Sequence, residues 1–100
     1  MGNKLVITII NRGFAEEVIE ESRKAGATGA TILHGRGSAG IGEQFLGMSI
    51  TPEREVVLIV VDEKLVTGVM DAIVARSGKS TPAGGISFSL PVSHISKLKH

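Results

Sequence analysis

The chain has 100 residues, of which 42% are hydrophobic, and its formal net charge is +1. This length and composition fit one globular domain and exclude a disordered chain. The near-neutral charge argues against nucleic acid or a membrane surface as a partner. The absence of cysteine excludes a disulfide framework and a thiolate metal site. The apolar run at the N-terminus is too short for a signal sequence or a membrane span, so we expect a cytoplasmic protein without membrane insertion.

The first third of the chain predicts a strand, a helix and a second strand. Leu5 to Ile10 is a nearly unbroken apolar run, which is typical of a strand buried on both faces. A helical pattern follows, with acidic residues in its first turns, Arg23-Lys24 in its last turn and Gly26 as its stop. Gly29 to His34 predicts a shorter strand of small residues. The apolar face of the helix comprises Phe14, Ala15, Val18, Ile19, Ser22 and Ala25.

Residues 35–52 separate the two halves of the chain. They contain five of the thirteen glycines, show no helical period and close with Thr51-Pro52. A connection of this length is usually functional or partly disordered. We therefore expect a flexible, functional loop within a single domain that spans residues 1–100.

The second half repeats the pattern of the first. Val56 to Val61 predicts another strand, and Asp62 or Glu63 is suited to cap the helix that follows. Residues 77–85 form a second glycine-rich loop, and residues 86–90 alternate between apolar and serine, as in a half-exposed edge strand. The predicted buried stripe of the second helix comprises Leu65, Val66, Val69, Met70, Ile73 and Val74.

The order β-α-β-β-α-β predicts an α+β fold, a ferredoxin-like sandwich with a four-stranded antiparallel sheet and two helices on one face. The first and third strands, which are apolar throughout, take the middle of the sheet. Two helices leave the other face of the sheet bare, and an apolar face of that size favours a partner. We expect an obligate oligomer; the alternative is that the tail or the loop folds over this face.

Several short motifs in the chain do not carry their usual chemistry. Residues 35–40 match G-x-G-x-x-G, but no helix follows, so a dinucleotide-binding fold is excluded. Gly78-Lys79-Ser80 lacks the earlier glycine of a phosphate-binding P-loop. The three histidines share no metal-ligand spacing, and no catalytic triad or carboxylate pair stands out. We therefore predict a protein that is not an enzyme and has no metal site.

Over nearly its whole length the sequence resembles the PII family of nitrogen regulatory signal-transduction proteins. Gly26 to Thr31 is similar to the family's G-x-T-G-x-T, and Arg36-Gly37 falls at the base of its long T-loop. Ser77-Gly78-Lys79 resembles the start of its B-loop. Ile59 to Glu63, with Val69 and Asp71 to Ile73, is similar to its third strand and second helix, and Gly85 to Val92 resembles its last strand.

The resemblance implies a homotrimer that binds an adenine nucleotide (AMP, ADP or ATP) as an effector in clefts between subunits, with no obligatory cofactor. The loop at 35–52 would transmit occupancy to a target enzyme, transporter or channel. Carried over by position, Ile9, Thr31 and Val60 would flank adenine, and Arg36 and Gly37 would shape the loop base. Glycine amides of the B-loop and two lysines of the tail would meet phosphate: Gly84, Gly85, Lys97 and Lys99.

The chain also departs from the family pattern. It has no tyrosine, so uridylylation of a T-loop tyrosine is impossible, and the loop is shorter than usual. Ile41 stands where the family has a glutamine for metal and 2-oxoglutarate, and lysines in place of arginines lose bidentate phosphate recognition. The alternatives of the same topology are an ACT-like small-molecule domain, a CutA-like trimer and an acylphosphatase-like enzyme, for which Asn11-Arg12 is the only candidate pair.

Overall fold

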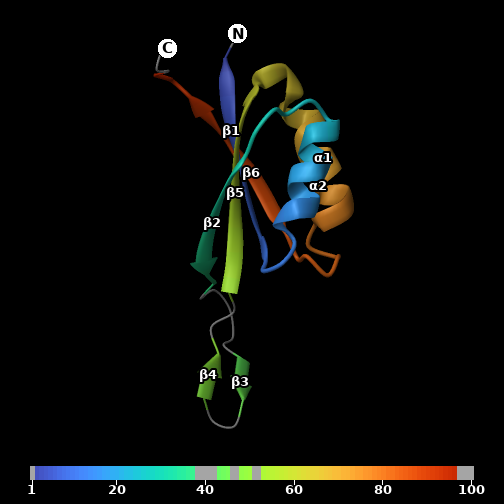
Figure 1. The fold of residues 1–100 in the computed structure, drawn as a ribbon, viewed down its shortest axis with the longest axis vertical. Helices are drawn as coiled ribbons and strands as arrows, with labels where there is room; N and C mark the ends of the chain where they lie inside the picture. The colour runs from blue at the N-terminus through green and yellow to red at the C-terminus, as the bar shows by residue number, and fades with distance from the viewer. Residues whose placement is uncertain (1, 38–42, 46–47, 51–52, 97–100) are drawn as a thin grey trace.

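Four antiparallel strands form one sheet in the computed structural model, which describes residues 2–37, 43–45, 48–50 and 53–96, with side chains for 2–37 and 53–96 (Figure 1). The strand order is β2-β5-β1-β6, so the two apolar strands take the middle as predicted. This confirms the ferredoxin-like α+β fold. The elements in chain order are β1 (Asn3–Asn11), α1 (Ala15–Lys24), β2 (Thr31–Arg36), β3 (Glu43–Phe45), β4 (Met48–Ile50), β5 (Glu53–Asp62), the short helix η1 (Glu63–Leu65), α2 (Val66–Ser77) and β6 (Ile86–Val92).

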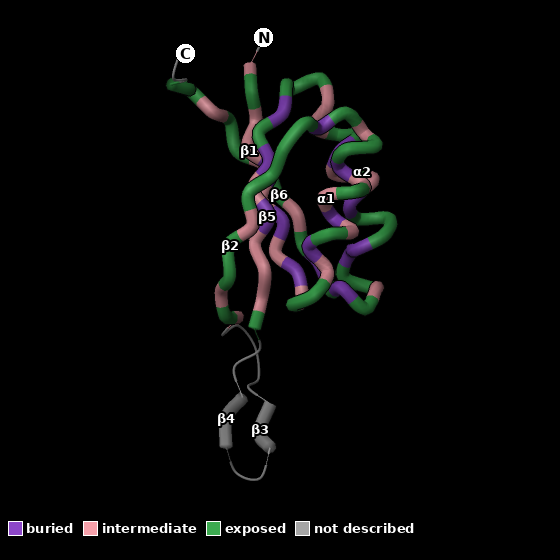
Figure 2. The backbone as a smooth tube through the Cα atoms, viewed as in Figure 1, coloured by how far each residue is buried: buried purple, intermediate pink, exposed green. Residues whose placement is uncertain are grey.

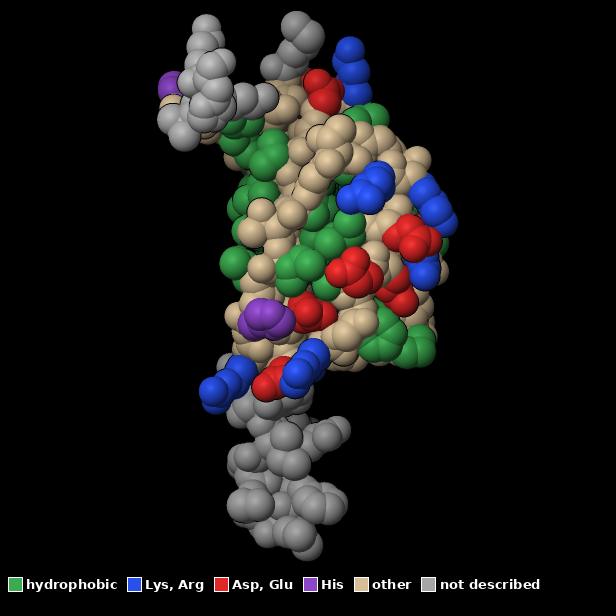
Figure 3. Space-filling view, viewed as in Figure 1, with side chains coloured by type: hydrophobic (Ala, Val, Ile, Leu, Met, Phe, Trp, Pro, Cys, Tyr) green, Lys and Arg blue, Asp and Glu red, His purple; other side chains and the backbone are tan. Residues whose placement is uncertain are grey.

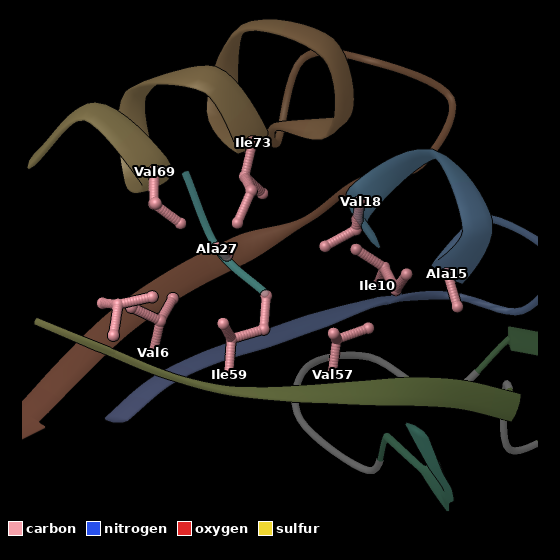
Figure 4. Close-up of a cluster of buried hydrophobic side chains, with 10 residues drawn as sticks. Val6, Ile10, Ala15, Val18, Ala27, Val57, Ile59, Val69 and Ile73 are labelled. Atoms are coloured by element: carbon pink, nitrogen blue, oxygen red, sulfur yellow. The ribbon is translucent and has the colours of Figure 1, made fainter. Parts of the chain in front are cut away.

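Both helices cover the same face of the sheet, and the core lies between these two layers (Figures 2 and 4). Alternate residues of β1 and β5 point toward the helices and are buried, as expected for a strand with a period of two. Thr8 is also buried on this face, where its hydroxyl shares a hydrogen bond of 2.9 Å with that of Ser87 on β6. The buried cluster comprises Val6, Ile10, Ala15, Val18, Ala27, Val57, Ile59, Val61, Val69 and Ile73.

The other face of the sheet has no helix over it, and its side chains are apolar. Within one chain, β1 is therefore buried on one face and only half-buried on the other. Each large exposed side chain that finds a partner contributes roughly 1.5–3 kcal/mol. The most exposed side chains on this face are Phe88 at 41%, Leu33 at 47%, Val60 and Leu90 at 48%, and Ile86 at 49%.

The second strand and the segment after it differ from the sequence-based prediction. The strand predicted at residues 29–34 is instead β2, which starts at Thr31 opposite Leu58 and ends at Arg36 opposite Glu53. The segment at 35–52 that was predicted as a flexible loop therefore begins with the last two residues of β2. It also contains β3 and β4, an antiparallel pair separated in sequence by two residues. Residues 38–42, 46–47 and 51–52 lie outside the described residues, so the predicted flexibility is not tested.

The ends of the helices follow the expected chemistry. Gly26 adopts a φ of +110°, the left-handed conformation that ends α1 and that other residues rarely adopt. The carboxylate of Asp62 accepts a hydrogen bond from the amide of Lys64 at 2.9 Å and so caps η1, the first turn before α2. One residue of the predicted stripe differs, because Val74 is 51% exposed and faces away from the core.

A cluster of charges ties α1 to α2 on the outer surface. One guanidinium nitrogen of Arg76 lies 2.9 Å from a carboxylate oxygen of Glu20 and 2.8 Å from one of Glu21, and Lys24 contacts both acids. Hydrogen bonds from Arg76, and then from Lys24, lower the pKa of both carboxyl groups. Below this cluster the buried hydroxyl of Ser77 donates a hydrogen bond of 2.5 Å to Glu17.

The loop from 78 to 85 is held tightly against the end of the sheet. The amide of Gly85 donates to the carbonyl of Ser77 at 2.8 Å, and the amide of Asn11 donates to the carbonyl of Ala83 at 2.9 Å. A Cβ at Gly85 would come within 2.3 Å of that Ser77 carbonyl oxygen and 2.8 Å of Ile10. The close approach of two backbones therefore requires glycine here.

Replacing Gly85 with alanine will lower the free energy of unfolding by about 1–3 kcal/mol, because backbone must move to admit the methyl group. The matched control is Gly68→Ala within α2, where the added methyl group meets nothing within 4 Å. This control will raise stability by about 0.5–1 kcal/mol, since alanine favours a helix interior. Urea unfolding of both variants measures the two effects. Equal effects of the two substitutions would contradict the packing argument.

Replacing Arg76 with glutamine will lower stability near neutral pH, and the deficit will disappear in acid. The folded-state pKa of Glu20 and of Glu21 is depressed, so their contribution is present above the unfolded-state pKa. It is lost as the pH falls through the folded-state pKa. Urea unfolding near neutral pH and at about pH 2.5 measures the difference. NMR titration will show the pKa values of both carboxyl groups rising in the variant. The control Arg23→Gln, at an exposed arginine of α1 beside the two glutamates, will leave them unchanged.

Candidate functional site

A hollow of about 420 Å³ lies on the bare face, where β2 begins beside β5. It forms because β5 continues to Asp62, whereas β2 pairs with it only as far as Leu58. The backbone of residues 28–30 closes one side of the hollow, and Leu5 of β1 contributes the floor. Thr31 and Val60, both predicted to flank adenine, line this hollow together. A hydroxyl beside apolar side chains is suited to a flat ring that also carries polar groups.

A second and larger hollow of about 700 Å³ adjoins the first and shares Thr28 and Val60 with it. It lies between the end of β5, the turn after α1 and the short helix η1. Besides Thr28, its polar residues are Asn3 and Asp62, and Ile95 from the segment after β6 also lines it. The two hollows together follow the part of β5 that β2 leaves unpaired.

The remaining predicted site residues lie near the other end of the sheet. Ile9 is also on the bare face, but it pairs with Val56, four residues along β5 from Val60. At roughly 3.3 Å per residue, this separates the two side chains by about 13 Å along the strand. Within one chain, therefore, Ile9 is too far away to contact a ring that binds beside Thr31 and Val60.

The two glycines predicted to offer amides to phosphate use these amides within the loop. The amide of Gly84 donates to the carbonyl of Thr81 at 2.9 Å, and that of Gly85 donates to Ser77. Gly84 has a φ of +57°, which turns the chain back toward β6. In this arrangement both glycines shape the loop that lies beside Ile9 and Asn11.

Arg36 and Gly37 lie where β2 ends and the 35–52 segment begins. Gly37 lies against the side chain of Arg54, whose Nε would be 3.4 Å from a Cβ at this position. Strand alternation places Arg36 on the helix side of the sheet, the face opposite to Thr31. Lys97 and Lys99 lie outside the described residues, so their predicted contacts with phosphate stay predictions.

The part of the chain with described side chains contains no group of three His, Asp or Glu residues that could hold a metal ion. None of the described helices is long and apolar enough to cross a membrane.

The family model described as Nitrogen regulatory protein P-II matches residues 3–100, nearly the entire chain. The chain belongs to the P-II family. A comparison with individually curated proteins gives no match. The family match favours a P-II-type regulatory protein over the ACT-like, CutA-like and acylphosphatase-like alternatives that share the topology. Proteins of this family are regulatory and are not enzymes.

The structure of this P-II protein also shows a pocket that the sequence did not predict. Basic side chains surround a hollow of about 300 Å³ at the base of the 35–52 segment. Of its lining residues, Arg36 was predicted as a site residue, because its position follows a recognisable motif. The others come from a turn and from facing strands, and only the register of β2 against β5 brings them together. The lining residues are Arg12, His34, Gly35, Arg36, Glu53 and Arg54.

Proposed function

We propose that this P-II protein is a homotrimeric sensor that binds an adenine nucleotide in clefts between its subunits. The observation that carries the proposal is the family match over residues 3–100. The fold supports it physically, because the sheet leaves an apolar face that a second copy of the same chain can cover. Burying five large apolar side chains in each chain makes such an assembly strongly favourable.

The division of the predicted site supports clefts between subunits. Thr31 and Val60 share a hollow at one end of the sheet, whereas Ile9 and the 78–85 loop lie near the other end. Within one chain these two groups are too far apart to enclose one purine ring. A cleft that places one group of one subunit against the other group of its neighbour brings them together. Lys97 and Lys99 of the tail then complete the site by meeting phosphate.

The segment at 35–52 is the proposed output of the sensor. It leaves the sheet between Arg36 and Glu53, beside the proposed cleft. A nucleotide that binds one arrangement of this segment more tightly than another shifts the population toward that arrangement. The favoured arrangement then docks on a target enzyme, transporter or channel. We expect this regulation to take place in the cytoplasm and to concern nitrogen metabolism.

Isothermal titration will detect binding of AMP, ADP or ATP to the full-length protein. Replacing Lys97 and Lys99 together with alanine will weaken this binding about tenfold or more, because two charged contacts to phosphate are lost. The matched control, Arg23→Ala with Lys64→Ala, removes the same charge from exposed positions elsewhere and will leave the affinity unchanged. If none of the three nucleotides binds, the proposed function is wrong.

Light scattering will give the mass of three chains for the wild-type protein. Phe88→Asp will shift the protein toward single chains, because it places a charge in the middle of the bare face. Val74→Asp is the control, since it introduces the same charge at an exposed apolar residue on α2, away from that face. A wild-type protein with the mass of one chain would exclude the trimer.

A further inference from the structure

The loop between α2 and β6, residues 78–85, uses its own backbone amides to hold its shape. Three of these amides donate to carbonyl groups of the same chain, and they belong to Thr81, Gly84 and Gly85. The distances from nitrogen to oxygen are 3.0, 2.9 and 2.8 Å in that order. Pro82 has no amide hydrogen at all. In this arrangement, therefore, these four residues have no free amide to offer a ligand.

Gly85 is also closed off by packing. It is buried, and a Cβ added there would lie 2.3 Å from the carbonyl oxygen of Ser77 and 2.8 Å from Ile10. Figure 3 shows charged side chains gathered over the helices and at the described end of β2, whereas the lower right corner, where Figure 1 places the loop after α2, is mainly uncharged. Since a phosphate group is larger than a methyl group, it cannot reach the amide of Gly85 unless the loop rearranges.

Asn11, the last residue of β1, fastens this loop to the sheet. Its side-chain amide donates to the carbonyl of Pro82 at 3.0 Å, and its backbone amide donates to the carbonyl of Ala83 at 2.9 Å. The side-chain nitrogen also lies close to Gly84, only 3.0 Å from where a Cβ would be. Asn11 therefore holds the loop in the form in which the amide of Gly84 donates to Thr81.

We propose that the cleft selects a nucleoside monophosphate over a triphosphate, and that Asn11 is the positioning residue behind this preference. The preference rests on the proposed function. A phosphate oxygen that leaves water without finding a donor lowers the affinity. Because the loop keeps its glycine amides, Lys97 and Lys99 remain as the proposed phosphate contacts. Two lysines balance one terminal phosphate, which carries about two negative charges at neutral pH.

Isothermal titration of the full-length protein with AMP, ADP and ATP at constant ionic strength tests this preference. The Kd for ATP will exceed that for AMP about tenfold or more, with ADP between them, because the outer phosphates bring charge that finds no donor. Equal affinities, or tighter binding of ATP through Lys79 of the loop, would overturn the preference and leave the proposed function standing. If none of the three binds, the proposed function is wrong and the preference falls with it.

Asn11→Leu keeps the size of the side chain but removes the donor to Pro82, so the loop can turn and free the amide of Gly84. The ratio of the Kd for ATP to the Kd for AMP will then fall about threefold or more. The control Thr81→Val removes a hydroxyl hydrogen bond of 2.7 Å to the carbonyl of Gly78, which the Thr81 amide still contacts, and will leave the ratio unchanged. An unchanged ratio in Asn11→Leu, or the same fall in both variants, would contradict the role of Asn11.

Amide hydrogen exchange measured by NMR tests the state of the loop without any nucleotide. In the wild-type protein the amides of Gly84 and Gly85 will exchange more slowly than in an unfolded peptide. In Asn11→Leu the amide of Gly84 will exchange about tenfold faster or more, whereas that of Gly68 within α2 will keep its rate. A wild-type Gly84 amide that exchanges as fast as in an unfolded peptide would show that this donor is free. That result would overturn the preference, whichever nucleotide binds.

Discussion

The whole structure depends on a four-stranded sheet that has helices over only one of its faces. This constraint explains why β1 and β5 carry apolar side chains on both faces of the sheet, although only the face under the helices belongs to the core. It also explains why the surface carries a row of half-exposed side chains that a monomer of this size has no reason to keep. Burial of that face against a partner would add stability, and this links the fold to the proposed assembly.

The second constraint is the register between β2 and β5. Because β2 starts opposite Leu58, the last residues of β5 have no strand beside them, and the hollows form along this edge. The same register brings Arg36 opposite Glu53 at the other end. A shift by one residue would exchange the two faces of β2 and move His34 and Arg36 to the apolar side. One strand pairing thus places both the apolar hollows and the basic pocket.

Much of the fold could be predicted from the sequence, because its signals are local. The apolar run at Leu5–Ile10, the stop at Gly26 and the cap at Asp62 each depend on neighbouring residues, and the structure confirms all three. The limits of β2 depend on its pairing with β5, which is more distant in sequence. The β3–β4 pair is local, but the glycine-rich composition of residues 35–52 obscured it. The basic pocket also depends on the register between β2 and β5. Likewise, only the loop geometry shows that the amides of Gly84 and Gly85 are already used.

The position of the basic pocket relates it to the segment that it adjoins. Its arginines come from the last residue of β2, the second residue of β5 and the turn after β1, so the pocket adjoins both strands that lead to the 35–52 segment. The register of β2 against β5 therefore decides which charged side chains stand at the base of the segment. Strand alternation places Arg36 and Arg54 on opposite faces of the sheet there.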